Sequence, residues 1–547
     1  MATRTLDVAE PWLEPASPPA RHLLDHRVHP AATIGFFVVL FGGLAYAGIS
    51  VFLDTQQVGE PLAMGAFLFL GLALLIALGF EFVNGFHDTA NAVATVIYTH
   101  SLKPIAAVVW SGVWNFIGVV VSTGAVAYSI ITLLPVDLIL GVGSAAGYAM
   151  IFALLLAAVI WNLGTWFLGL PNSSSHALIG SILGVGLANQ MMSSGGTAGV
   201  DWGQAEKVLL ALLVSPVIGF VAALLLIRVM KRALPDPQLY REPQAGKPPP
   251  LHIRILLIFT CTAVSYAHGS NDGQKGMGLI MLILIGVAPT AYALNRTMPD
   301  SSTPAFVAAG QAARSVFDER AGGILMTPDT AHETLRQALK TESVDRAPVY
   351  AALSAVSRDI DRDLQSYGSL RKVPAAQTPN LRNEMYLVAD TLHQLTKDED
   401  ARRVDAGEKQ RLDGYAELLS KGTRFIPTWV KIAVALALGL GTMIGWRRIV
   451  MTVGERIGKS HLTYGMGAAA ELVAASTILL AQVKGMPVST THILSSGVAG
   501  TMVGSGEGVQ RRTVRNIALA WVLTLPAAMA LAGMLYVLLL GVVRLMG

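Results

Sequence analysis

A short polar motif that occurs twice in otherwise apolar sequence carries the most chemically informative residues of this chain. Its copies occupy residues 169–176 (GLPNSSSH) and 485–492 (GMPVSTTH), at a constant offset of 316 residues (487 − 171). Proline favours the first turn of a helix, and a nearby Ser or Thr can cap that helix. The free amides of a helix N-terminus, together with hydroxyl donors, bind anions. Two such ends facing each other would suit a compact tetrahedral oxyanion, whereas hydroxyls that bond helix to helix are the alternative.

A second motif, centred on an aspartate, also occurs twice and in the same order. It reads NGFHDTANA over residues 84–92 and HGSNDGQKG over residues 268–276, with Asp88 and Asp272 lying 184 residues apart (272 − 88). A charge in apolar surroundings costs several kcal/mol unless it is compensated. We expect the flanking glycines to break the helix at each aspartate, so that carboxylate and carbonyl oxygens suit a small hard cation or a proton. The alternative is a carboxylate that only caps a helix.

The elements that hold these motifs are predicted by composition and by apolar runs. The 547 residues are 53% hydrophobic and only 14% charged, whereas a soluble chain carries about 25% charged residues. Runs long enough to cross a lipid bilayer include 33–53, 147–168, 207–227 and 517–541. We therefore predict a polytopic membrane protein. The formal charge of +4 is too small to indicate nucleic acid as a partner, and a single Cys261 excludes a disulfide framework or a thiolate metal site.

The two offsets predict an internal duplication with an insertion in its second half. They differ by 132 residues (316 − 184), and residues 294–424 are polar and mixed in charge. Within this stretch, Pro348–Tyr367 and Glu384–Leu418 are helix-like. The sequence therefore predicts a soluble helical insertion, to which we assign no ligand.

The basic residues predict how the chain crosses the membrane. By the positive-inside rule, three segment ends are cytoplasmic, and they carry Arg228, Lys231, Arg232, Arg447, Arg448, Arg456, Lys459, Arg511, Arg512 and Arg515. Each repeat then crosses an odd number of times, so that the second repeat starts on the opposite side and the repeats are inverted. The predicted fold class is an all-α polytopic membrane protein with two inverted repeats, broken helices and about 11–12 transmembrane segments. The soluble helical insertion is expected on the extracytoplasmic side.

These features divide the chain into seven regions. The first region lacks the basic patch and the apolar stretch that a signal peptide would have. The seven regions are 1–32, a disordered N-terminal tail; 33–53, an extra transmembrane helix; 63–232, the first repeat; 233–253, a cytoplasmic linker; 254–292, the start of the second repeat; 293–425, the insertion; and 426–547, the remainder of the second repeat.

Taken together, the motifs resemble the inorganic phosphate transporter (PiT) family, and especially its bacterial Pit-type low-affinity members. The resemblance covers roughly residues 63–545. It rests on residues 84–94, 161–176, 268–278, 441–448 and 485–492. It implies secondary active import of inorganic phosphate, often as a neutral complex with a divalent cation, coupled to protons or sodium. It also implies the inner (plasma) membrane of a bacterium as the location.

The resemblance implies roles for residues of both motifs. Phosphate binding is implied for six hydroxyl side chains: Ser173, Ser174, Ser175, Ser489, Thr490 and Thr491. Coupling to a cation or proton is expected for Asp88, Asn91, Asp272, Asn271, His87, Lys275 and Glu471. Asn84, His176 and His492 are further candidates, and the metal ligands are left unassigned.

Two departures from the family's Gly-Ala-Asn-Asp-x-x-Asn-Ala motif bear on the coupling ion. Phe86 and His87 stand where Ala-Asn would stand in the first copy, and Lys275 replaces the last Asn in the second. A buried Lys supplies the positive charge that a sodium ion would otherwise bring, and His can carry a proton near neutral pH. We therefore predict a proton-coupled symporter, with sodium coupling as the alternative.

Other functions are weighed against this prediction. A sulfate permease of the same fold is the nearest alternative, since sulfate has the shape of phosphate but no proton to donate to a carboxylate. A passive anion channel would not accumulate its substrate. A membrane phosphatase would need a nucleophile beside a base; Ser175 and His176 are sequence neighbours, which do not face each other on a helix. We expect no enzymatic activity and no cofactor apart from the co-transported metal, and a homodimer is compatible with the sequence.

Overall fold

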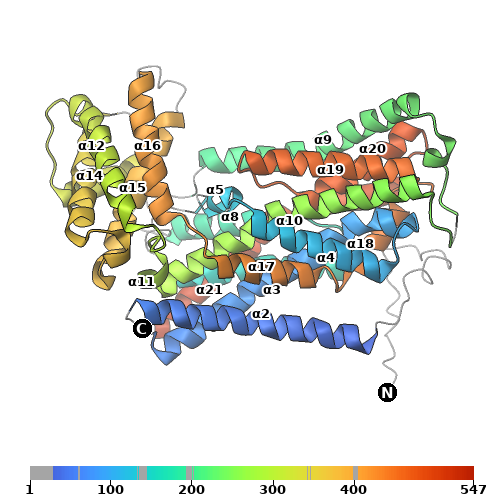
Figure 1. Ribbon diagram of the computed structural model, residues 1–547, viewed down its shortest axis with the longest axis horizontal. Coiled ribbons are helices and arrows are strands. Elements are labelled where there is room, and N and C mark those ends of the chain that lie inside the picture. Colours follow the sequence, from blue (N-terminus) through green and yellow to red (C-terminus); the bar gives the residue numbers. More distant parts are fainter. Residues whose placement is uncertain are drawn as a thin grey trace.

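The computed structural model describes residues 29–546 except 59–61, 132, 135–143, 193–199, 201, 245, 342, 345 and 398–404. Most of the predicted N-terminal tail, residues 1–28, therefore lies outside the described residues. The described chain is nearly all helical (Figure 1). The membrane part contains α2 (Pro30–Gln57), α3 (Met64–Tyr98), α4 (Pro104–Val121), α5 (Ala125–Ile131), α7 (Ala145–Phe167), α8 (Ser174–Met192), α9 (Trp202–Ala233), α10 (Leu251–Val287), α17 (Thr428–Gly441), α18 (Trp446–Met451), α19 (Tyr464–Val483), α20 (Thr490–Ser505) and α21 (Arg511–Met546).

The lengths of these helices agree with a polytopic membrane protein. Within the described ranges, eight helices are long and apolar enough to cross a membrane, and nine if one bent pair of helices is counted as a span. The sequence predicts about 11–12 segments, and the difference arises partly from short helices. α17 has 14 residues and α20 has 16, whereas a full span needs about 20.

Equivalent glycines end the helices that precede the two hydroxyl motifs. Gly169 follows α7 and Gly485 follows α19, with φ angles of 67° and 64°. This left-handed region favours glycine, and a proline two residues later cannot continue the helix. The chain is therefore broken at both hydroxyl motifs, as predicted, and new helices α8 and α20 begin there.

The helix breaks predicted at Asp88 and Asp272 are wrong. α3 and α10 continue through both aspartates. The neighbouring glycines instead allow close helix crossings, because a Cβ on Gly85 would lie 2.2 Å from a carbonyl oxygen of α17. A Cβ on Gly269 would lie 2.2 Å from a carbonyl oxygen of α4. These glycines hold the aspartates in place by bringing two backbones together, rather than by unwinding a helix.

The two repeats exchange their last helices. α8 of the first repeat packs along α21 of the second, and α9 of the first packs along α20 of the second. A Cβ on Gly184 in α8 would lie 2.0 Å from the Met529 carbonyl oxygen in α21, and one on Gly500 in α20 would lie 2.2 Å from the Phe220 carbonyl oxygen in α9. Gly184 and Gly500 are separated by the offset of the hydroxyl motifs, so equivalent residues make equivalent contacts.

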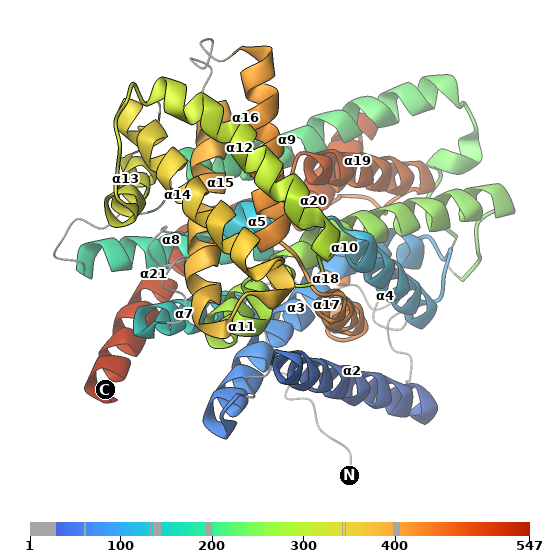
Figure 2. The ribbon, with the colours of Figure 1, turned by 60° about the vertical axis from the view of Figure 1, so that its left-hand side comes forward.

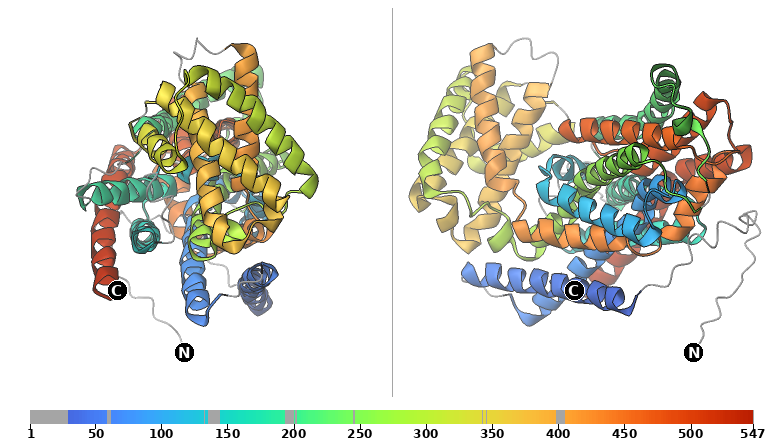
Figure 3. Two further views of the ribbon diagram at one scale, coloured as in Figure 1. Left: turned by 90° about the vertical axis from the view of Figure 1, so that its left-hand side faces the viewer. Right: turned by 45° about the vertical axis from the view of Figure 1, so that its right-hand side comes forward.

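The insertion is a helical bundle with its own apolar core, which includes Phe306, Leu353 and Tyr415. It lies at one end of the long axis of the molecule (Figure 1), and Figures 2 and 3 show that it covers this end. Its helices, with the short α11 that leads to them, are α11 (Pro289–Tyr292), α12 (Thr303–Arg320), α13 (Pro328–Thr341), α14 (Ala347–Tyr367), α15 (Thr378–Lys397) and α16 (Ala406–Thr423).

One helix prediction in the insertion is confirmed and one is wrong. α14 corresponds to the helix predicted over Pro348–Tyr367, whereas the stretch Glu384–Leu418 contains parts of two helices, α15 and α16. The physical reason is a capping box at the start of α16. The Asp405 side chain accepts from the Glu408 amide at 2.7 Å, and the Glu408 carboxylate accepts from the Asp405 amide at 3.0 Å.

The basic segment ends meet at the end of the molecule opposite the insertion. Lys231 near the end of α9 donates to the Ser505 carbonyl oxygen at the end of α20, over 3.3 Å. The Lys459 amide donates to the Gly508 carbonyl oxygen at 3.2 Å, just before α21. In Figure 1 this end of α9 and α20 lies on the right and the insertion on the left. The arrangement agrees with one cytoplasmic side for all three basic clusters.

Candidate functional site

The carboxylate of Asp88 joins the first turns of the two helices that follow the hydroxyl motifs. Ser174, the first residue of α8, donates to Asp88 Oδ2 at 2.7 Å. Thr491, in the first turn of α20, donates to Asp88 Oδ1. All three residues are buried. An anion is stabilised between two helix N-termini, and in this conformation that anion is the Asp88 carboxylate itself.

The first serine of each hydroxyl motif caps its own helix. Ser173 accepts from the His176 amide, and Ser489 accepts from the His492 amide, both at 3.1 Å. The His176 Nδ1 also lies 2.8 Å from the Ser173 hydroxyl. The rings of His176 and His492 pack against each other with centroids 4.4 Å apart, and His492 stacks on Trp521 at 4.0 Å. The two histidines therefore form a contact between the repeats.

The ammonium of Lys275 links the second aspartate to the first hydroxyl motif. Its Nζ lies 2.6 Å from Asp272 Oδ2 and 2.5 Å from the Ser175 hydroxyl oxygen. Ser175 in turn donates to the Val488 carbonyl oxygen at 2.9 Å. Lys275 and Asp272 have no solvent-exposed surface, so this is a buried ion pair whose disruption leaves a single buried charge. Ser175 has its own partners and does not form the nucleophile–base pair of a hydrolase with His176.

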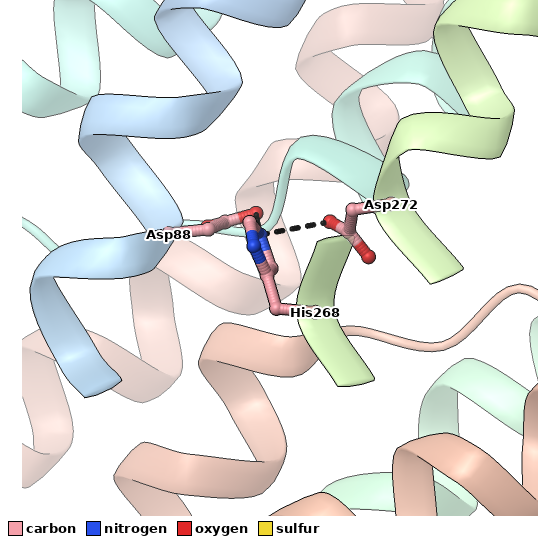
Figure 4. Close-up of side chains that lie close together, drawn as sticks. All are labelled: Asp88, His268 and Asp272. Carbon is pink, nitrogen blue, oxygen red and sulfur yellow. Dashed lines mark ion pairs between the residues drawn. The ribbon is translucent and has the colours of Figure 1, made fainter. Parts of the chain in front are cut away.

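His268 belongs to the site, although the sequence analysis assigned it no role. Its Nε2 lies 3.6 Å from Asp272 Oδ2 and 3.9 Å from Asp88 Oδ2, and Figure 4 shows the ring between the two carboxylates. On the other side of the ring, Nδ1 lies 2.6 Å from Asn115 Oδ1 in α4. His268 and Asp272 are four residues apart on α10 and hence on one helix face. That spacing was the sequence signal that could have identified His268.

Glu81 is a second buried group that the sequence analysis missed. It lies on α3 seven residues before Asp88, which is two helical turns on the same face. The residue is fully buried, and Asn84 donates to its Oε2 at 3.4 Å. A Cβ on Gly276 would lie 2.3 Å from Glu81 Cγ, so the carboxyl group packs against the turn of α10 that carries Lys275. Glu81 thus brings a third carboxyl group to the contact between α3 and α10.

Other predicted residues lie around this cluster. His87 Nδ1 is 3.8 Å from Asp88 Oδ1, and its Nε2 is 3.3 Å from the Thr165 hydroxyl. Asn271 donates to the Met486 carbonyl oxygen at 3.3 Å, which ties α10 to the second hydroxyl motif. Asn91 lies in α3, but its side chain is outside the described residues.

Glu471 and Thr490 differ in their relation to the cluster. Glu471 is buried in α19 and accepts from the Thr260 hydroxyl at 2.6 Å. Its hydrogen bond to α10 therefore lies about two helical turns before His268. Thr490 lines a small cavity together with Asp88, Asn115 and His268. This cavity has room for about one water molecule, which means that the cluster is closed around its polar groups in this conformation.

Comparisons with known proteins show what this chain is similar to. The profile described as "Phosphate transporter family" matches residues 84–247 and 237–532. The low-affinity inorganic phosphate transporter PitA of Escherichia coli (strain K12) is 43% identical over 496 residues, which cover 86% of this chain and 97% of PitA. A low-affinity inorganic phosphate transporter of Buchnera aphidicola (subspecies Acyrthosiphon pisum) is 38% identical and is 96% covered, over 86% of this chain. A solved structure titled "The sodium-dependent phosphate transporter" aligns with a TM-score of 0.47 at 19% identity, covering 86% of this chain and 98% of that one.

Proposed function

Because this chain belongs to the phosphate transporter family, we propose that it is an integral membrane symporter that imports inorganic phosphate together with protons. Phosphate crosses as a complex with a divalent metal ion, and the membrane is the bacterial inner membrane. The two repeats are inverted and provide alternating access to a site between them. The reciprocal packing of α8 on α21 and of α9 on α20 supports this architecture.

One observation carries the proposal, namely that Asp88 fills the position between two helix N-termini. The hydroxyls of Ser174 and Thr491 that hold it are donors suited to a phosphate oxygen. A phosphate bound to the same hydroxyls would lie about 4 Å from the carboxylate, and two unit negative charges at that distance repel by about 4 kcal/mol at an effective dielectric constant of about 20. Phosphate therefore needs a compensating positive charge at this place, and a proton can provide it.

Lys275 supports protons rather than sodium as the coupling ion. Its Nζ is 2.6 Å from Asp272 Oδ2, which is the place beside this carboxylate where a cation would bind. A covalently attached ammonium at this position already neutralises Asp272. We therefore propose that transport does not require sodium.

The charge balance of the site favours the movement of one proton with a neutral substrate. Asp88 and Asp272 carry two negative charges and Lys275 carries one positive charge, so these three groups sum to one negative charge. A neutral metal–hydrogen phosphate complex leaves this sum unchanged. One proton on Asp88 or Asp272 brings it to zero, which lowers the cost of moving the loaded site through surroundings of low dielectric constant.

Uptake of radiolabelled phosphate into proteoliposomes tests the proposal. With an inward proton gradient, we expect uphill uptake that is the same in sodium and in choline buffers. Asp272→Asn should abolish it, whereas Asp236→Asn, at the exposed end of the linker before α10, should leave it unchanged. Uptake that follows sodium would overturn proton coupling, and accumulation of sulfate instead of phosphate would overturn the substrate. Phosphate equilibration without accumulation would indicate a passive channel.

A further inference from the structure

Three buried side chains of the site converge on one point. Asp88, His268 and Asp272 each direct one ligand atom inward, and these atoms all lie within 4.8 Å of one another. Figure 4 shows that Asp88 comes from one helix, while His268 and Asp272 come from neighbouring turns of another. The group is thus assembled from α3 of the first repeat and α10 of the second.

The imidazole of His268 provides separate evidence for a ligand at this point. Asn115 Nδ2 donates to the Ser111 carbonyl oxygen at 3.0 Å, which orients Asn115 Oδ1 toward His268 Nδ1 at 2.6 Å. Because an amide oxygen only accepts, Nδ1 carries the hydrogen and Nε2 faces the two carboxylates. His268 is only 3% exposed, and its Nε2 has no hydrogen-bond partner among the described residues. A buried imidazole nitrogen beside two carboxylates is unfavourable unless a cation, either a proton or a metal ion, lies between them.

We propose that Asp88, His268 and Asp272 bind the divalent metal ion of the transported metal–phosphate complex. The inference rests on the proposed phosphate symport and assigns its metal to named ligands. Asn115 orients the imidazole, as the outer-shell partners of metal-binding histidines do. Two of the three ligands, Asp88 and His268, also line the small cavity beside the first turn of α20.

Binding of the metal changes the role of Lys275. The ammonium and the ion compete for Asp272 Oδ2, since Nζ lies 2.6 Å from it and His268 Nε2 lies 3.6 Å from it. When the ion takes this oxygen, Lys275 keeps its contact with Ser175 at the first hydroxyl motif. There it is available to a phosphate oxygen. Metal ligands must be deprotonated, so Glu81 is the carboxyl group at the contact between α3 and α10 that is left to carry the coupled proton.

The ligand set also predicts which metals are carried. Carboxylate oxygens suit Mg²⁺, Ca²⁺ and Mn²⁺, whereas an imidazole nitrogen favours later first-row ions such as Co²⁺ and Zn²⁺. Two carboxylates and one imidazole should therefore bind Co²⁺ more tightly than Mg²⁺. His268 is the residue that sets this preference.

Titration of the purified full-length protein with Co²⁺ tests the site without reference to transport. Wild type should show visible absorption bands of protein-bound Co²⁺, and phosphate should strengthen the binding. His268→Asn keeps an amide nitrogen near the Nδ1 position that faces Asn115 and removes Nε2. Since loss of even an outer-shell partner weakens metal binding by about 10- to 100-fold, we expect this variant to bind Co²⁺ at least about 100-fold more weakly. His268→Gln, which offers an oxygen instead, should shift the preference toward Mg²⁺.

A matched control lies on the same helix. His252 Nε2 is 3.6 Å from Asp236 Oδ2 at the exposed end of α10, the same distance as between His268 Nε2 and Asp272 Oδ2. His252→Asn therefore removes a similar imidazole–carboxylate pair that lies outside the site. This variant should bind Co²⁺ as wild type does. Equal Co²⁺ binding in wild type and His268→Asn would overturn the metal site, as would wild-type protein that transports phosphate with protons but binds no Co²⁺. Either result would overturn the metal site but leave the proposal of proton-driven phosphate uptake intact. If the wild-type protein took up no phosphate, the proposed function itself would be overturned.

Discussion

Replacing Lys275 by methionine should convert the proposed proton-driven carrier into one that requires sodium. Methionine has nearly the length of lysine but no charge, so it leaves the Asp272 carboxylate buried without its ion-pair partner. The Nζ–Oδ2 distance of 2.6 Å corresponds to an attraction of about 6 kcal/mol at an effective dielectric constant of about 20. Breaking a buried pair by removing one partner costs about 3–5 kcal/mol in measured cases. We therefore expect sodium-free phosphate uptake to fall by at least about 100-fold, since 1.4 kcal/mol is about tenfold.

A sodium ion that binds beside Asp272 should restore part of this loss. The assay compares initial rates of phosphate uptake into proteoliposomes in choline and in sodium buffers, at a fixed pH gradient. Lys431→Met is the matched control, because Lys431 lies on α17 and donates to the Ser122 carbonyl oxygen at 2.9 Å rather than to a carboxylate. It should lower neither rate by more than about twofold, as expected for loss of one hydrogen bond of modest net value.

Two results would refute this reasoning. If Lys275→Met took up phosphate at the wild-type rate without sodium, the ammonium would not be neutralising a charge that transport requires. If the variant were inactive in both buffers yet remained monodisperse and bound phosphate normally, Lys275 would act in the conformational change rather than as an attached cation.

Three further predictions concern other parts of the molecule. Glu81→Gln should abolish uptake driven by a pH gradient but retain phosphate exchange across liposomes, measured by counterflow, because the amide cannot bind and release a proton. Gly184→Leu should lower the melting temperature and the yield of folded protein, since its Cβ would meet a carbonyl oxygen of α21 at 2.0 Å and overpacking costs about 1–3 kcal/mol or more; Gly164→Leu, where a Cβ meets nothing within 4 Å, is the control. In the insertion, a hydrogen bond to Glu384 raises the pKa of His332, so its stabilisation is present below about pH 6.5 and is lost as pH rises through the raised value. Amide exchange in α13 should quicken between pH 6 and pH 8 beyond the intrinsic rate, and His332→Gln should remove that difference.

The duplicated motifs made much of this architecture predictable from sequence. Glycine, proline and hydroxyl residues in the order found at 169–176 require a helix end followed by a helix start, and the structure has both. This local chemistry needs no knowledge of distant contacts. The same holds for the apolar runs, whose length alone identifies membrane helices.

The aspartate motifs were harder to interpret because glycine has two uses in a helix. From the sequence alone, Gly85 and Gly269 are expected to break their helices, whereas both lie in continuous helices at close crossings with another backbone. Only the position of the partner helix distinguishes the two uses, and α17, the partner of Gly85, comes after an insertion of more than a hundred residues. His268 and Glu81 were missed for a related reason, since their roles depend on α3 and α10 lying together.

The exchange of helices between the repeats has a consequence for biosynthesis. A ribosome delivers α8 and α9 to the membrane long before α20 and α21, against which they pack in the finished protein. Gly184 on α8 faces the Met529 carbonyl oxygen of α21, and Gly219 on α9 faces the Ile493 carbonyl oxygen of α20. The helix faces around these glycines therefore contact lipid or neighbouring helices while the insertion is translated and folds. In each half the last two helices pack along helices of the other half, and α8 receives its long partner only when α21 has been made. A chain that stops before α21 therefore leaves the first half without a packing partner as well as the second half incomplete.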